Sequence, residues 1–259
     1  MARTAVFVLA AFCGVFFIQN IQHLQRTPAQ ETQTIEATRF RVLVKMFDEN
    51  SPKPKQIAEH LILFDNDMIY GVPSDDEGQI VVIDQERDRI ILLDRNSKQR
   101  SDIATSSLVG LTAKLRASAT DTKLAERLGV NAKVDYDKSS EEYSVKYGQI
   151  AYQTTVQKPV ASTIAPQFGE YVTWTSRLNV ARPTGVPPLG RMRLNEKISI
   201  DGLIPKTTKL TISSGLTHTA FRSEYELVER INLTDKKMIG NVSDMLATFT
   251  AVPFKDFPR

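Results

Sequence analysis

Histidine is the side chain that most often carries acid–base or metal chemistry, and this chain has only three. His23 follows an apolar N-terminal run, and His60 and His218 each lie alone at the expected edge of a strand. Neither has a second histidine or a cysteine nearby at the spacing of a metal site. Because active sites need partnered groups, we expect no catalytic role for these histidines and no bound metal.

Two acidic clusters offer the oxygen atoms that calcium prefers, Asp65 with Asp67 and residues 75–77. Neither has EF-hand spacing, and both fall where turns are expected, which is an ordinary place for Asp and Asn. Serine nucleophile elbows, glycine-rich phosphate loops and H-E-x-x-H are absent from the sequence. We therefore expect no enzyme activity and no cofactor. A hydrolase built from scattered acids is the least favoured alternative.

Aromatic residues gather in the middle of the chain, on neighbouring expected strands and on the helix that follows them. The ordinary interpretation is that they pack a sheet against a helix. The functional alternative is that they line an apolar pocket. They are Tyr136, Tyr143, Tyr147, Tyr152, Phe168, Tyr171 and Trp174.

The first twenty residues predict export. Arg3 precedes an apolar run over residues 4–18, and polar residues follow at once. The run is short for a membrane span, which needs about 17–25 apolar residues, but is long enough for the core of a signal peptide. We expect residues 1–29 to be a cleaved signal peptide, with an uncleaved membrane anchor or a buried helix as alternatives. The predicted location is the periplasm or another extracytoplasmic compartment.

The rest of the chain reads as a linker over residues 30–37 and a single domain over residues 38–259. Without residues 1–29 the body has 31 basic and 30 acidic residues, so its charge gives no reason to expect a nucleic-acid partner. The only cysteine is Cys13, inside the apolar run. The body therefore has no disulfide and must be stabilised by its core alone.

Alternating apolar residues predict a half-buried strand from Phe40 through Val42 to Val44. The hairpin over residues 80–93 is apolar on both faces, so both faces must be covered. The period then changes, and residues 105–129 predict a helix or two shorter helices.

The second half of the chain predicts strands over 131–157, helices over 161–200, two more strands, and a helix over 235–246 that Thr234 caps. Strands built as hairpins, with helices in two insertions and at the end, predict an α+β fold. Its sheet is mainly antiparallel with helical insertions.

The segment from Phe40 to Asp94 resembles a known family. Residues 63–70, L-F-D-N-D-M-I-Y, are similar to the D-G-x-x-hydrophobic-aromatic hairpin of the periplasmic lipoprotein-carrier superfamily, without its glycine. Residues 83–94 are similar to the F-D-x-x-R-x-R-x-x-L-L-D hairpin of uncharacterised exported bacterial proteins. The resemblance implies a curved sheet like half a barrel, closed by a helix, that binds acyl chains in its concave face.

These observations predict an exported, non-catalytic protein of the cell envelope that binds an apolar or acylated ligand, either a lipid or an acylated protein. The alternative is a structural or protein-interaction domain without a small-molecule ligand. An unfilled concave face would favour the first. The expected ligand contacts lie on the first strand and on the helix after the hairpins: Phe40, Val42, Val44, Leu108, Leu111 and Leu115.

Overall fold

The computed structural model describes residues 39–75, 78–183, 185–215 and 217–258. The expected signal peptide or anchor and the linker, residues 1–37, lie outside the described residues. Within the described ranges, no helix is both long enough and apolar enough to cross a membrane.

Twelve strands of the described residues form one open, curved sheet, so the fold is α+β with a mainly antiparallel sheet, as the sequence predicts. Their order is β12-β6-β5-β4-β3-β2-β1-β11-β10-β9-β8-β7, and only β12 runs parallel to its neighbour. The strands are β1 (Arg39–Asp48), β2 (Lys55–Asp65), β3 (Met68–Pro73), β4 (Ile80–Asp84), β5 (Arg89–Asp94), β6 (Gln99–Ala104), β7 (Val134–Asp137), β8 (Glu142–Tyr147), β9 (Ile150–Gln157), β10 (Ile204–Ser214), β11 (Thr217–Val228) and β12 (Thr250–Ala251).

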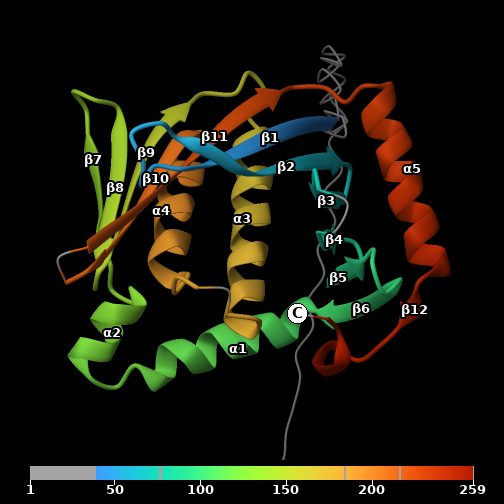
Figure 1. The fold of residues 1–259 in the computed structure, drawn as a ribbon, viewed down its shortest axis with the longest axis horizontal. Helices are drawn as coiled ribbons and strands as arrows, with labels where there is room; N and C mark the ends of the chain where they lie inside the picture. Colours follow the sequence, from blue (N-terminus) through green and yellow to red (C-terminus); the bar gives the residue numbers. More distant parts are fainter. Residues whose placement is uncertain (1–38, 76–77, 184, 216, 259) are drawn as a thin grey trace, which may run out of the picture. The chain divides into compact units, whose positions relative to one another are not determined.

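The described residues also form five helices (Figure 1). Two of them, α3 and α4, stand side by side with the middle strands crossing over them. A third, α5, lies beyond β3 to β5, and α1 and α2 run across the opposite end of α3 and α4. The bounds are α1 (Thr105–Ser118), α2 (Thr122–Leu128), α3 (Ile164–Ala181), α4 (Leu189–Ile200) and α5 (Leu233–Thr248).

The strands that are apolar on both faces are covered on both faces, as their sequence predicts. On one face, Ile83, Ile90 and Leu92 pack in a cluster with Phe168 of α3. On the other face, α5 buries its apolar side against the sheet. That second cluster contains Leu63, Tyr70, Val72, Ile80, Val82, Ile91, Leu93 and Val242, with Met238, Ile239, Met245 and Leu246 packed against it.

The start of α5 differs from the sequence prediction. Asn232, not Thr234, is the N-cap, and its side chain accepts a hydrogen bond from the backbone of Asp235. The Asp235 carboxylate accepts in return from the backbone N–H of Asn232. Both residues thus satisfy amide groups that the helix end leaves free, and the helix begins at Leu233.

The turns of the β3–β6 hairpins explain the acidic residues of the segment 83–94. Asp84 ends β4 and accepts a hydrogen bond from the backbone N–H of Arg87 at 3.1 Å. Asp94 ends β5 and accepts one from the backbone N–H of Ser97 at 2.8 Å. The later turn residue Asp88 has a φ of 48°, a left-handed conformation that Asp tolerates. These aspartates therefore fix the turns and the register of the sheet.

Asp84 is the more deeply buried of the two carboxylates, with 1% of its surface exposed. The Nε atom of Arg89 donates to it at 2.9 Å, and Arg87 adds a longer ion pair at 3.3 Å. Burial disfavours its charge, but the hydrogen bonds from Arg89 and Arg87 outweigh burial and lower the pKa of Asp84. The ionised form is therefore a stabilising part of the folded state.

We expect Asp84→Asn to lower the free energy of unfolding by about 1–3 kcal/mol at neutral pH, because it removes charge-assisted hydrogen bonds from a buried site. Because the pKa of Asp84 is lower in the folded protein than in the unfolded one, its ionised form stabilises the fold at pH values above the unfolded pKa. The difference in stability between the variant and the wild type should therefore shrink as the pH falls below about 4. Chemical denaturation at several pH values measures both. Asp88→Asn, in the same turn but exposed, is the control and should change little. Equal stability of Asp84→Asn and wild type would contradict this role.

The helical segment 105–129 is two helices, the second of the two alternatives above. α1 ends at Ser118 and α2 begins at Thr122, with the side chain of Asp121 capping α2. α1 contacts β6 and α3 rather than lying over the sheet. Only the side of α1 with Leu108 and Thr112 is buried.

This packing separates two leucines that the sequence places on one stripe. Leu108 is fully buried in the core, whereas Leu111 is 41% exposed. We expect Leu108→Ala to cost about 2–5 kcal/mol of stability and Leu111→Ala to stay within about 0.5 kcal/mol of the wild type. Denaturant titration of both variants tests this. A large loss of stability in Leu111→Ala would mean that α1 packs against the rest of the protein through a different side.

Candidate functional site

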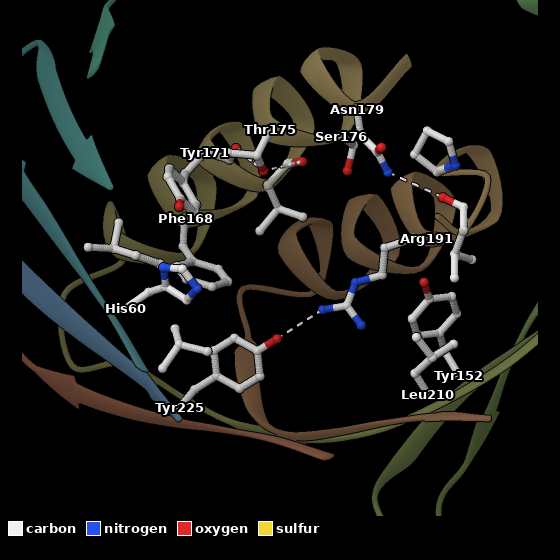
Figure 2. A pocket seen from close by; sticks show the side chains of 15 residues that line it. His60, Tyr152, Phe168, Tyr171, Thr175, Ser176, Asn179, Arg191, Leu210 and Tyr225 are labelled. Carbon is white, nitrogen blue, oxygen red and sulfur yellow. Dashed lines mark hydrogen bonds between the residues drawn. The ribbon is translucent and has the colours of Figure 1, made fainter. Parts of the chain in front are cut away.

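A cavity of about 470 Å³ lies between the concave face of the sheet and the helices α3 and α4 (Figure 2). Its size is within the range of about 300–1,000 Å³ that is typical of small-molecule sites. Five strands form one wall, with Val44, His60, Ile62, Tyr152, Leu210 and Tyr225. The other wall comes from α3, the loop that precedes α4 and the start of α4, with Phe168, Tyr171, Val172, Thr175, Ser176, Asn179, Val186, Pro188 and Arg191.

The register of the sheet brings the strand residues together. Val44 of β1 is paired with His60 on one side and with Tyr225 on the other. Further along the wall, Leu210 of β10 is paired with Tyr152 of β9. Because residues directly opposite one another point to the same face, five strands contribute side chains to one concave surface.

The cavity exists because the inner side of α3 changes along the helix. Ile164 and Phe168, in its first half, are buried in the core. At the positions that continue this side, Thr175, Ser176 and Asn179 have smaller, polar side chains. The curved sheet does not close onto this smaller half, so a space remains beside it.

Two of the polar groups that α3 contributes, on Thr175 and Asn179, have partners within the protein. Thr175 donates its hydroxyl to the backbone carbonyl of Tyr171 at 3.0 Å, one turn earlier in the helix. Asn179 donates its side-chain amide to the carbonyl of Val186 at 3.2 Å, a bond drawn in Figure 2. Because these groups are already bonded, they present little unsatisfied polarity to a ligand.

Among the described residues that line the cavity, Arg191 is the one with a permanent charge. It lies in the first turn of α4 and extends toward Tyr225, to whose hydroxyl oxygen it donates at 3.1 Å (Figure 2). Its guanidinium carbon lies 5.0 Å from the centre of the Tyr152 ring, a cation–π distance. These two aromatic residues therefore fix the direction of the guanidinium group.

A glycine sets the position of α4, and thus of Arg191. A Cβ atom on Gly190 would lie 2.2 Å from the ring of Tyr147 in β8, too close for any side chain. The Tyr147 hydroxyl donates to the carbonyl of Pro187 at 2.7 Å, just before the helix. The close approach of α4 to β8 thus depends on Gly190 having no side chain.

A second cavity, of about 430 Å³, adjoins the first. The two share Tyr152, Val186, Arg191, Leu210 and Tyr225. The second adds apolar residues near the rim of the sheet: Met46, Ile57, Ile212 and Phe221. Ile57 is 48% exposed, so this part opens to solvent. Arg191 thus stands where an inner and an outer apolar space meet.

The structure brings together some of the residues that the sequence predicts as ligand contacts, and separates others. Val44 lines the cavity, and Phe40 and Val42 are buried in the adjoining core. Leu108 belongs to that core as well. Leu111 and Leu115 do not line this cavity, because α1 crosses α3 instead of covering the concave face. The helices that lie against the concave face are α3 and α4.

The aromatic residues divide in the same way. Tyr152, Phe168 and Tyr171 line the cavity, while Tyr143 is buried against α4 and Tyr136 is 43% exposed. Sequence reasoning missed Arg191 and Tyr225 altogether. Their types and spacing carry no motif, and they meet only through the sheet and the loop that precedes α4.

Other groups of potentially reactive side chains give weaker evidence for a functional site. Among the described residues, no group of three or more His, Cys, Asp or Glu residues could hold a metal ion. Ser213 and His218 form a 3.1 Å hydrogen bond, but they are an exposed cross-strand pair at the end of a hairpin. In the part of the chain that the structure describes, no carboxylate hydrogen bonds to His218, so the pair lacks the third group of a catalytic triad.

No protein-family model matches this sequence, and no curated protein matches it.

The pH dependence of stability tests whether His60 is buried in the cavity. Burial lowers the pKa of His60 below 6.5, against a smaller opposing effect of Asp75. The unfolded state therefore takes up a proton first, so stability should fall as the pH drops below about 6.5. We expect His60→Gln to lose stability less steeply than the wild type between pH 7.5 and 5, measured by thermal melting. His218→Gln, outside the cavity, is the control, and identical slopes for His60→Gln and wild type would refute the buried environment.

Proposed function

We propose that this protein is a non-catalytic binding protein for an apolar or acylated ligand, and that it acts outside the cytosol in the cell envelope. The observation that carries the proposal is the cavity between the concave sheet face and α3. The protein leaves this space unfilled, although a well-packed core has few voids larger than a water molecule.

The lining supports a hydrocarbon ligand. Val44, Ile62, Phe168, Val172 and Leu210 supply apolar surface, and the hydroxyl of Thr175 and the amide of Asn179 are bonded within the protein. Such a surface gains free energy when an apolar group replaces water. The resemblance of residues 40–94 to the periplasmic lipoprotein carriers points to the same ligand class. The apolar N-terminal run supports the extracytoplasmic location.

The alternative is a protein-interaction domain without a small-molecule ligand. Val109 and Leu111 favour it, because both are more than 40% exposed on α1. Isolated apolar residues on a surface are common, however, and two do not form a large patch. Ligand binding by the cavity distinguishes the two functions.

The test is titration of the full chain with N-phenyl-1-naphthylamine, a neutral apolar probe whose fluorescence rises on transfer out of water. We expect saturable binding. Thr175→Phe should weaken it at least about tenfold, because the larger ring occupies the cavity. The same substitution at Thr173 is the matched control, since this threonine also donates to the carbonyl four residues earlier but faces the other side of α3.

Both variants keep the N-terminal apolar run, so probe that binds to that run contributes equally to all three proteins. Thermal melts show whether each variant is folded. Absence of saturable binding by the wild type, or equal binding by Thr175→Phe and Thr173→Phe, would contradict the proposal and favour the interaction domain.

A further inference from the structure

The charges around the two adjoining cavities are unbalanced. Among the described residues that line them there is no Asp and no Glu, while Arg191 is present in both linings. In that same part of the chain, no carboxylate lies within ion-pair distance of Arg191. The nearest polar partner is the hydroxyl of Tyr225, which is neutral.

This arrangement is costly for the protein alone. A partly buried guanidinium is normally paired with an anion, because burial removes the water that would otherwise solvate its charge. Arg191 also lies in the first turn of α4, which has no acidic residue. The helix dipole does not offset a positive charge at that end. The contact with Tyr225 uses one N–H group of the guanidinium. Its other N–H groups can donate hydrogen bonds to an anion.

We infer that the ligand is a single-chain anionic amphiphile whose carboxylate or phosphate head group binds Arg191, with its hydrocarbon chain along the inner cavity. The inference rests on the proposed function and adds the ligand's charge to it. The head group lies at the junction of the two cavities, beside Tyr225 and Tyr152. The chain runs from there past Val172 and Phe168 toward Val44 and Ile62.

The distribution of charge along the cavity agrees with this orientation of the ligand. Arg191 and His60 lie toward different sides of the cavity in Figure 2. Burial favours the neutral form of His60, so the far side holds no second fixed cation at neutral pH. An anion therefore has one preferred position, and the outer cavity gives the head group a route from solvent.

The experiment is displacement of N-phenyl-1-naphthylamine from the full chain by compounds that share one hydrocarbon chain. Dodecanoate, dodecyl phosphate and dodecanol differ only in the head group. We expect one or both anions to displace the probe at concentrations about tenfold below dodecanol, and the stronger of them identifies the head group. Acetate and inorganic phosphate, which lack the chain, should not displace it.

Arg191→Gln should remove the preference for the anions while the probe and dodecanol still bind, which shows that the variant is folded. Arg191→Lys should keep part of the preference, because it keeps the charge but loses the planar fork. Arg193→Gln, at an exposed arginine of the same helix outside both linings, is the control and should keep all of it.

The outcomes separate this inference from the proposed function. If the probe binds but dodecanol displaces it as well as the anions do, the inference fails and the proposed function stands. Equal preference in Arg191→Gln and wild type also overturns the inference. Displacement by inorganic phosphate alone would mean that a free anion is bound instead. If the wild type does not bind the probe at all, both proposals fail.

Discussion

The need to cover a long sheet on both faces determines this structure. Where β4 and β5 are apolar on both faces, the sheet needs a layer on each side, and α3 and α5 provide these layers. The curvature of the sheet lets helices from the second half of the chain reach the concave face of strands from the first. The turns at Asp84 and Asp94 keep those strands in register, so every apolar side chain stays on its own face.

The cavity follows from the same arrangement. A curved sheet around a helix is filled only where the helix side that faces it has large side chains. On the side of α3 that lines the cavity, Phe168 and Tyr171 are followed by the smaller Thr175 and Ser176. Beyond Phe168, smaller residues such as Thr175 and Ser176 leave room, and their neighbours on five strands cannot move in without breaking the sheet's hydrogen bonds. A space of this kind is stable because the backbone around it is fixed by pairing.

The placement of Arg191 depends on contacts with two separate parts of the sheet. Its helix is held against β8 by the close contact of Gly190 with Tyr147, while its side chain reaches across to Tyr225 in β11. Tyr152 of β9 and Tyr225 of β11, two strands that are not neighbours in the sheet, both contact its guanidinium group. Aromatic side chains direct the charge, and none of the carboxylates that the structure describes pairs with it, which is the basis of the proposed anion site.

The sequence by itself determined the elements of this protein and the class of its fold. Alternation along β1, the apolar hairpin of β4 and β5, and the Pro-rich break before α4 are local patterns, and local patterns fix strands, helices and turns. Only the tertiary structure decided which helix occupies the concave face. Leu108 and Leu111 are both leucines on the apolar stripe that the sequence predicts, yet the crossing of α1 over α3 buries Leu108 and exposes Leu111. The meeting of Val44, Tyr225 and Arg191 likewise depends on strand pairing and helix packing across long stretches of chain, and no short-range pattern encodes such contacts.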